Sequence, residues 1–287
     1  LLLGDVDYDR GPDQTAAASK TKHSYRPSSA LTFGPLTNTG LEITSIRDLH
    51  GKLFGIKSDD PRALVQREAD EARFRELAPQ YRNLHLATHG FFAGAEYASA
   101  LAVEQSDRNR SVAMGSEVPL KGFNPGLLSG LALAGANREP TSNEDDGILT
   151  AQEIGVMNLS GVDTVVLSAC DTGLGATAGG EGLLGVQRAF QVAGARTTVA
   201  SFWKVDDLAT RLLMERFYRN LWEKKLPRLD ALREAQLWML EKGTEQGSVG
   251  RAPRLKTLSE PVAPAVPKAT RTSPYYWAPF VLSGDWR

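Results

Sequence analysis

Two residues that end apolar segments carry side chains suited to nucleophilic chemistry. Cys170 follows the apolar run Val162–Ala169, and His89 follows the shorter segment Asn83–Thr88. A cysteine thiolate is a strong nucleophile, and a neighbouring imidazolium stabilises it and can protonate a leaving amine. Together they would attack a carbonyl, as in a cysteine peptidase. Taken singly, the cysteine also fits a small buried side chain, and the histidine a structural one.

Backbone groups beside both residues suit the oxyanion of a tetrahedral intermediate. Gly90 permits a backbone N–H to approach a carbonyl closely, and the N–H of Cys170 lies where a strand ladder ends. The glycine-rich stretch 173–182 follows the cysteine and could close over a peptide. It lacks the Lys-Ser/Thr that ends a phosphate-binding loop and does not fit the dinucleotide pattern, so no nucleotide site is predicted.

The sequence around the other histidines does not suggest a catalytic or metal-binding group. His85 shares a strand face with His89 at a spacing of four, and we interpret it as a packing or supporting residue. A zinc site would need more ligands than its surroundings offer. His23 and His50 lie in a loop and a helix without partners for chemistry. The predicted chemistry requires no metal and no cofactor.

Composition excludes several classes of protein. The 287 residues include one cysteine, so neither an internal disulfide nor a cysteine-rich metal cluster is available. The net charge of the chain is −1, so its overall charge does not favour binding to nucleic acid. No apolar run approaches the roughly 18 residues of a membrane span. Since 41% of the residues are hydrophobic, a packed core is expected. We expect a soluble cytoplasmic protein.

Strand-like and helical periodicities alternate along the chain, which predicts an α/β fold with a mostly parallel sheet and helices on both faces. Ligand sites of such sheets lie at the carboxyl ends of the strands. His89 and Cys170 would therefore meet if their two strands were adjacent and parallel. The predicted strands are Leu1–Val6, Asn83–Thr88, Val162–Ala169, Thr197–Phe202 and Phe280–Leu282. The predicted helices are Thr39–Phe54, Ala69–Leu77, Leu149–Val156, Leu183–Val192, Asp207–Glu223 and Leu229–Leu240; residues 126–134 are ambiguous. We expect Gly55 to end the first helix, Asp70 to cap the second, and Thr150 with Glu153 to form a capping box in the third.

Polar, Gly- and Pro-punctuated stretches interrupt these segments. Residues 9–30 and 242–274 are predicted to be mobile loops or insertions, and 104–119 and 136–147 are shorter ones. The chain begins without Met on a strand-like run. We expect residues 1–287 to form one domain of a longer polypeptide.

Blocks in this order resemble the CHAT domain, a family of caspase-like cysteine peptidases related to separase. They read LHLATHGFF, SGLALAGA, DGILTAQEI, VVLSACDTGLG, GGEGLLGVQRAFQVAGARTTVASFWKVDD and PYYWAPFVLSGD. The resemblance implies a caspase-like sandwich around a mostly parallel sheet. It also implies a bacterial protein in which tetratricopeptide repeats often precede the domain.

The resemblance assigns roles to residues of the matching blocks. His89 matches the catalytic histidine, Cys170 the nucleophile, and Gly90 with the Cys170 backbone the oxyanion hole. Asp206 or Asp207, after Trp203-Lys204-Val205, matches the acidic residue that receives a basic side chain before the scissile bond; Asp207 is favoured. Asp171 is a further pocket candidate. One of the Asp206–Asp207 pair would alternatively cap the following helix, and some CHAT peptidases do not require a basic residue.

These implications give two functional hypotheses. The first is a cysteine endopeptidase that cleaves a protein substrate and is activated by an upstream sensor domain or a partner, without contacts to nucleic acid or membrane. The second is a latent or inactive caspase-like module that serves protein interaction or scaffolding.

Overall fold

A six-stranded sheet organises the computed structural model, in the order β2-β1-β3-β7-β8-β9. All neighbouring strands are parallel except β9, which runs antiparallel to β8. The predicted α/β class with a mostly parallel sheet is therefore confirmed. The strands are β1 (Leu2–Val6), β2 (Ala63–Gln66), β3 (Asn83–Leu86), β7 (Thr164–Leu167), β8 (Thr197–Ser201) and β9 (Phe280–Gly284). The structure describes residues 1–9, 32–55, 62–92, 125–138, 145–168, 181–203, 205–242 and 271–287.

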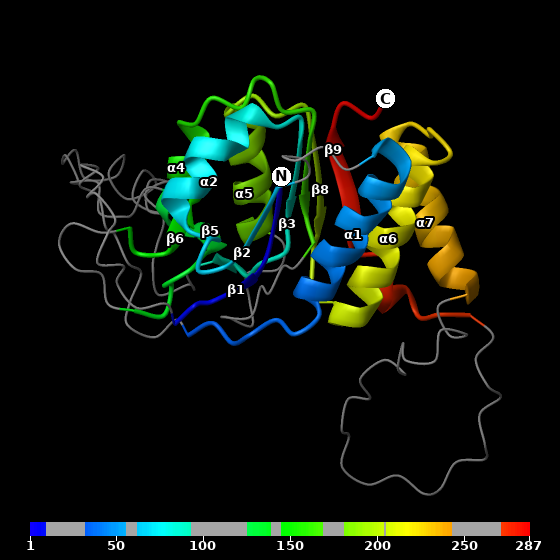
Figure 1. Cartoon of the computed structure of the whole chain (residues 1–287), viewed down its shortest axis with the longest axis horizontal. Coiled ribbons are helices and arrows are strands. Elements are labelled where there is room, and N and C mark those ends of the chain that lie inside the picture. Colours follow the sequence, from blue (N-terminus) through cyan, green and yellow to red (C-terminus); the bar gives the residue numbers. More distant parts are fainter. Residues whose placement is uncertain are drawn as a thin grey trace, which may run out of the picture.

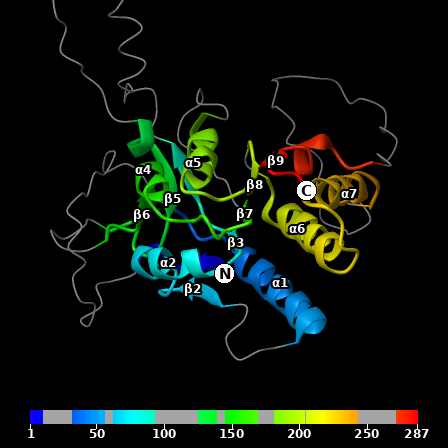
Figure 2. The ribbon, with the colours of Figure 1, turned by 90° about the horizontal axis from the view of Figure 1, so that it is seen from above.

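Helices cover both faces of this sheet (Figures 1 and 2). One face carries α1 (Thr39–Phe54), α6 (Asp207–Trp222) and α7 (Arg228–Lys242). The other face carries α2 (Glu71–Leu77), α4 (Ala151–Gly155) and α5 (Glu181–Val192). Short 3₁₀ turns span Ala78–Gln80, Pro125–Leu127 and Pro274–Tyr276. The result is the three-layer sandwich expected of a caspase-like fold.

Alternation along the buried strands builds a separate core on each face. Leu84 and Leu86 pack with the residues of α2 and α5, whereas Ala87 and Val166 pack with those of α1 and α6. Successive side chains of a strand point to opposite faces, so strands buried on both sides read as continuous apolar runs. That explains why the segment around β7 was recognisable from sequence.

Local signals for helix ends proved accurate. The Asp70 carboxylate accepts a hydrogen bond from Arg73 N at 2.8 Å and caps α2. Thr150 and Glu153 form the predicted capping box at the start of α4. Gly55 ends α1 as expected. These short-range hydrogen bonds satisfy backbone groups that a helix end leaves unpaired.

A second, antiparallel sheet was not predicted. It has the order β4-β5-β6, with β4 (Gly90–Phe92), β5 (Ser129–Ala132) and β6 (Ile148–Thr150). The helix predicted over Leu149–Val156 was wrong at its start, because Ile148–Thr150 pairs with β5. Strand β2 was also not predicted. Strands of three or four residues are too short to show a period and depend on distant partners.

The long predicted loops lie mainly outside the described residues. This holds for 10–30, 104–119 and 243–270. At the end of the last one, the backbone N–H of Thr272 donates to Leu240 O at 2.9 Å, which joins the chain to the end of α7. Within the described ranges, none of the helices has the length and apolar character needed to cross a membrane.

Candidate active site

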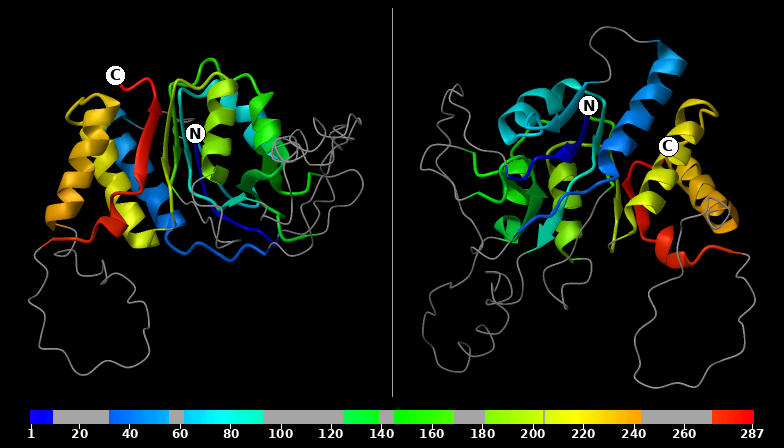
Figure 3. Two further views of the ribbon diagram at one scale, coloured as in Figure 1. Left: turned by 180° about the vertical axis from the view of Figure 1, so that it is seen from behind. Right: turned by 60° about the horizontal axis from the view of Figure 1, so that its bottom comes forward.

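Strands β3 and β7 are neighbours and parallel, the arrangement that the site hypothesis required. Leu86 is paired with Leu167, and Ser168 N donates to Leu86 O at 3.1 Å. His89 comes three residues after Leu86, and Cys170 comes three residues after Leu167. The paired ends of β3 and β7 lie at one end of the sheet, which the right view of Figure 3 turns toward the viewer. Cys170 itself and Asp171 lie outside the described residues.

The imidazole of His89 is held in one orientation. Its side chain is buried, and Nε2 lies 2.6 Å from the carbonyl oxygen of Gly34. A carbonyl only accepts hydrogen bonds, so Nε2 carries the hydrogen. In the neutral ring Nδ1 then holds the lone pair that can take up a proton.

Aromatic rings enclose His89 from two separate segments. The ring centroid of Tyr8 lies 5.1 Å from that of His89, and the centroid of Phe33 lies 5.6 Å from it. The Thr88 hydroxyl donates to Ala132 O at 2.5 Å, so the Tyr8 hydroxyl donates to Thr88 Oγ1 at 3.0 Å. This relay joins the end of β3 to β5 and fixes the backbone that carries His89.

The Tyr8 phenol beside His89 stays protonated and neutral. Burial raises the pKa of its phenol to about 12, and hydrogen bonds with the Thr88 side chain and the His89 backbone oppose the effect. The charges of Asp207 and Asp5 raise the pKa further. Asp207, at the start of α6, is therefore near enough to Tyr8 for its charge to act on the phenol.

Gly90 presents its backbone away from the small sheet. It is opposite Leu131, while Ala132 N donates to His89 O at 2.9 Å, which makes Gly90 and Leu131 a non-hydrogen-bonded pair. In such a pair the N–H groups point away from the partner strand. A Cβ added at Gly90 would come no closer than 3.8 Å to a described atom, the Gly130 oxygen. Packing of the described residues thus leaves room for a side chain at this position.

The two adjacent aspartates have different local roles. Asp206 Oδ1 accepts hydrogen bonds from Leu208 N and Ala209 N, each at 3.1 Å, so Asp206 caps α6. The alternative capping interpretation of this pair is therefore confirmed for Asp206. Asp207 is the first residue of α6 and half-buried. It remains the candidate for a basic substrate side chain.

Comparison with known families agrees with the arrangement of the strands. A family model described as the CHAT domain matches residues 7–285. The chain belongs to the CHAT-domain family. This match includes the segments of His89 and Cys170 and relates the chain to caspase-like cysteine peptidases. A search of the curated proteins found no match.

The shared strand face predicted for His85 and His89 was wrong. His85 of this CHAT domain points into the core on the α1 and α6 face, whereas His89 contacts Tyr8 and Phe33 of the other core. Strand β3 ends at Leu86, so its alternation does not extend to His89. Its Nε2 lies 2.9 Å from Glu42 Oε1, and its Nδ1 lies 3.0 Å from the Tyr218 hydroxyl. The carboxylate accepts from Nε2–H, so the Tyr218 hydroxyl donates to Nδ1. Burial and the charge of Glu42 raise the pKa of Tyr218, which keeps this donor protonated. The packing role predicted for His85 agrees with these contacts.

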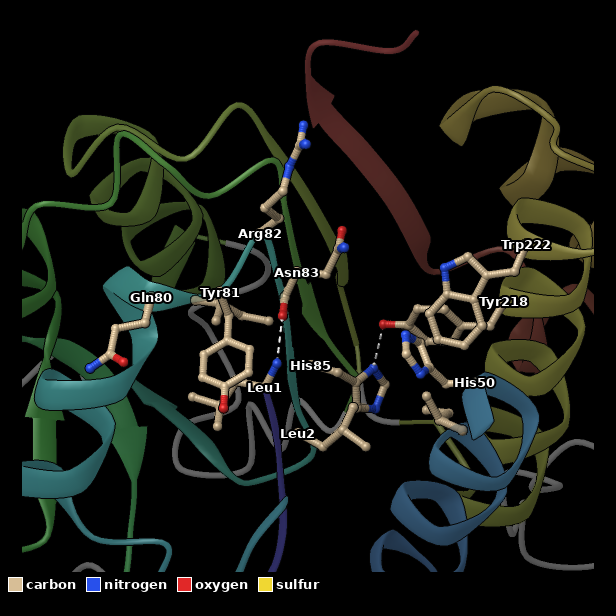
Figure 4. Close-up of a pocket in the computed structure, with 12 residues that line it drawn as sticks. Leu1, Leu2, His50, Gln80, Tyr81, Arg82, Asn83, His85, Tyr218 and Trp222 are labelled. Atoms are coloured by element: carbon tan, nitrogen blue, oxygen red, sulfur yellow. Dashed lines mark hydrogen bonds between the residues drawn. The ribbon is translucent and has the colours of Figure 1, made fainter. Parts of the chain in front are cut away.

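A hollow of about 540 Å³ lies at the opposite end of the sheet, where β1 and β3 begin (Figure 4). His50, His85 and Trp222 line part of it. The hollow is therefore remote from the ends of β3 and β7, which precede His89 and Cys170 in the sequence. Among the described residues, no group of three or more His, Cys, Asp or Glu side chains is placed to hold a metal ion.

Sequence reasoning missed the groups that hold His89. Tyr8, Phe33 and Gly34 come from segments that flank the predicted loop 9–30. Asn137, which contacts Phe33, follows the SGLALAGA block by one residue and was assigned to a loop. Their only visible signal was proximity to recognisable blocks, since their contacts span 55 to 104 residues of sequence.

Proposed function

We propose that this CHAT domain is a cysteine endopeptidase that uses Cys170 and His89. The observation that carries the proposal is the register of β3 and β7, which gives both residues the same offset beyond paired strand ends. The orientation of His89 adds support, because its Nε2–H is engaged by Gly34 and its Nδ1 carries the basic lone pair. A nucleophile, a base and an orienting group for the base are the usual parts of such a site.

The first half of the reaction forms an acyl-enzyme. The Cys170 thiolate attacks the scissile carbonyl carbon, and a carbon–sulfur bond forms while the carbonyl π electrons move to oxygen. Backbone N–H groups of Gly90 and Cys170 donate to that oxyanion. The intermediate collapses, the carbon–nitrogen bond breaks, and the protonated His89 gives its proton to the departing amine.

The second half restores the enzyme. His89, now neutral, takes a proton from a water molecule whose oxygen attacks the thioester carbonyl. The carbon–sulfur bond breaks, the new carboxyl group leaves, and the thiolate of Cys170 remains beside the imidazolium of His89. The site therefore begins the next cycle with the charges that it had at the start.

The substrate is proposed to be a protein with Arg or Lys before the scissile bond. Asp207 would meet that cation by a charge-assisted hydrogen bond. Asp207 raises the pKa of Tyr8, and this effect supports the role, because the Asp207 charge then lies near the aromatic ring that contacts His89. We further propose a cytoplasmic, bacterial setting, in which an upstream repeat domain or a partner protein activates cleavage.

Peptidyl chloromethyl ketones test this function on the full chain. The expected result is covalent labelling of Cys170 that is much faster with an arginyl reagent than with a chloromethyl ketone lacking the peptide. His89→Ala should remove that acceleration, and Cys170→Ala should abolish peptide cleavage while the fold is retained. Since Cys170 is the one cysteine in the sequence, mass spectrometry of intact protein reports its modification.

Two outcomes would overturn the proposal. One is a Cys170→Ala protein that still cleaves the same peptides. The other is labelling that never exceeds the rate of the simple reagent, even with the upstream region and candidate partners added. The second outcome would favour an inactive interaction module.

A further inference from the structure

The Gly34 carbonyl that orients His89 lies in a segment that no helix or strand holds in place. Residues 32–36 connect to the start of α1 without regular secondary structure, and Gly34 and Pro35 are exposed. Only Phe33 of this segment is fully buried. A backbone carbonyl keeps a fixed direction only when its neighbours are fixed, so the Gly34 oxygen needs an anchor nearby.

Asn137 supplies a two-point anchor one residue away. Its Oδ1 accepts from Phe33 N at 2.7 Å, and its Nδ2 donates to Phe33 O at 2.9 Å. The amide thus binds the backbone of Phe33 as a neighbouring strand would. Fixing both the N–H and the C=O of Phe33 fixes the peptide plane that leads into Gly34.

The same side chain also ties this segment to the one that carries Tyr8. Nδ2 of Asn137 donates to Asp9 Oδ1 at 2.8 Å, and the backbone N–H of Asn137 donates to Tyr8 O at 2.9 Å. Both aromatic rings that enclose His89 therefore belong to segments that Asn137 holds. Within the described ranges, Asn137 is the side chain that hydrogen-bonds to the Phe33 backbone, so the anchor depends on this amide and on the Phe33 ring.

We propose that Asn137 is a positioning residue, which holds the Gly34 carbonyl against His89 Nε2 and thereby fixes the ring orientation and the tautomer in which Nδ1 is the basic nitrogen. The catalytic consequence rests on the proposed peptidase function, whereas the contact itself does not. Loss of the Asn137 amide releases Phe33 and Gly34, and the His89 ring then loses its fixed orientation.

Nuclear magnetic resonance of the imidazole N–H tests the contact without reference to activity. Wild type should show an Nε2–H proton of His89 that exchanges slowly with water, assigned by its absence in His89→Gln. Asn137→Ala should lose this signal or make it exchange rapidly. Asn158→Ala is the matched control, because Asn158 is an exposed asparagine whose side chain bonds Ser160, and it should leave the signal unchanged.

Asn137→Asp is the second variant, in case truncation unfolds the chain. It has the same shape but cannot donate to Phe33 O, and it places a second carboxylate beside Asp9. It should lose the Nε2–H signal as Asn137→Ala does. For either variant, labelling of Cys170 by the arginyl chloromethyl ketone should slow by about tenfold, the usual effect of losing one orienting hydrogen bond.

The outcomes separate this inference from the proposed function. An unchanged, slowly exchanging Nε2–H signal in folded Asn137→Ala or Asn137→Asp would overturn the positioning role. So would global unfolding of both variants with no folded population, since Asn137 would then be structural. Loss of the signal in an enzyme that never labels would keep the contact and reject the peptidase.

Discussion

Leu86 and Leu167 lie opposite each other on the parallel strands β3 and β7. His89 and Cys170 each come three residues after this pair in the sequence. A one-residue slip of either strand would reverse which face each side chain points to. Packing on both faces fixes this register, because Leu86 and Leu167 belong to the core on the α2 and α5 face, whereas Ala87 and Val166 belong to the core on the α1 and α6 face. The site is therefore positioned by packing on both faces of the sheet.

Gly90 should be needed for activity and dispensable for stability. A methyl group at position 90 has room among the described atoms, so Gly90→Ala should change the free energy of unfolding by no more than about 0.5 kcal/mol. The methyl group would obstruct a substrate carbonyl, and labelling by the arginyl chloromethyl ketone should slow by about tenfold or more.

Gly130→Ala is the matched control for that substitution. Its added Cβ would lie 2.5 Å from Leu149 O and 2.8 Å from the Phe91 ring, so it should lose about 1–3 kcal/mol of stability. Urea unfolding of both variants checks the pair. Equal destabilisation by the two alanines, or unchanged labelling of Gly90→Ala, would contradict the role given to Gly90.

Asp206 should contribute to the stability of the fold, and Asp207 to the preference for a basic substrate residue. Asp206→Ala removes the cap of α6 and should cost about 1 kcal/mol of unfolding free energy while keeping any preference for arginyl over leucyl reagents. Asp207→Ala should abolish that preference and cost less stability. Labelling rates with both reagents and a urea titration test the two variants. A preference lost in Asp206→Ala and kept in Asp207→Ala would reverse the assignment.

The buried contacts of His85 should matter for stability. The side chains of His85 and Glu42 are 1% and 2% exposed. His85→Ala leaves the buried Glu42 carboxyl group without its histidine partner and should lower the free energy of unfolding by about 3–5 kcal/mol. Tyr218→Phe removes one neutral hydrogen bond and should cost about 1 kcal/mol. Chemical denaturation measures both. If His85→Ala cost no more than Tyr218→Phe, the contact with Glu42 would be energetically unimportant.

Tyr8 should make the fold sensitive to alkali. At neutral pH, Tyr8→Phe should lose about 1 kcal/mol with the Thr88 hydrogen bond. The pKa of Tyr8 in the folded protein is about 12, above its ordinary value of 10. Between these values the unfolded chain releases the proton and the folded one keeps it, so wild-type stability falls as pH rises, by up to about 3 kcal/mol.

The phenylalanine variant lacks that proton and should not show the fall. Its deficit relative to wild type should therefore shrink and reverse between about pH 10 and 12. Urea unfolding of both proteins across this range measures the difference. A deficit that stayed constant with pH would mean that the phenol is not held neutral by the fold.

Sequence patterns predicted the parts of the molecule that depend on local or periodic signals. The buried segment around β7, the cap at Asp70 and the capping box at Thr150 could all be predicted because their causes lie within a few residues. The pairing of His89 with Cys170 was predicted from their positions after two strands, and the CHAT resemblance added the catalytic role of each. The strands of the small sheet, β4 to β6, were missed because their pairing joins segments far apart in the chain.

The support of His89 could not be predicted for the same reason. The Gly34 carbonyl and the Asn137 amide act through backbone geometry, which leaves little trace in residue type. Asp206 and Asp207 were equivalent in sequence, and only the hydrogen bonds of α6 distinguish them.

The most direct test of the Cys170–His89 dyad is the rate of Cys170 alkylation by iodoacetamide as a function of pH. An imidazolium beside the thiol lowers the thiol pKa well below its ordinary value of about 8.5. Wild type should therefore react about tenfold or more faster than His89→Ala near pH 6, and the two rates should converge above about pH 9. Identical profiles, each with one inflection near about pH 8.5, would contradict the dyad.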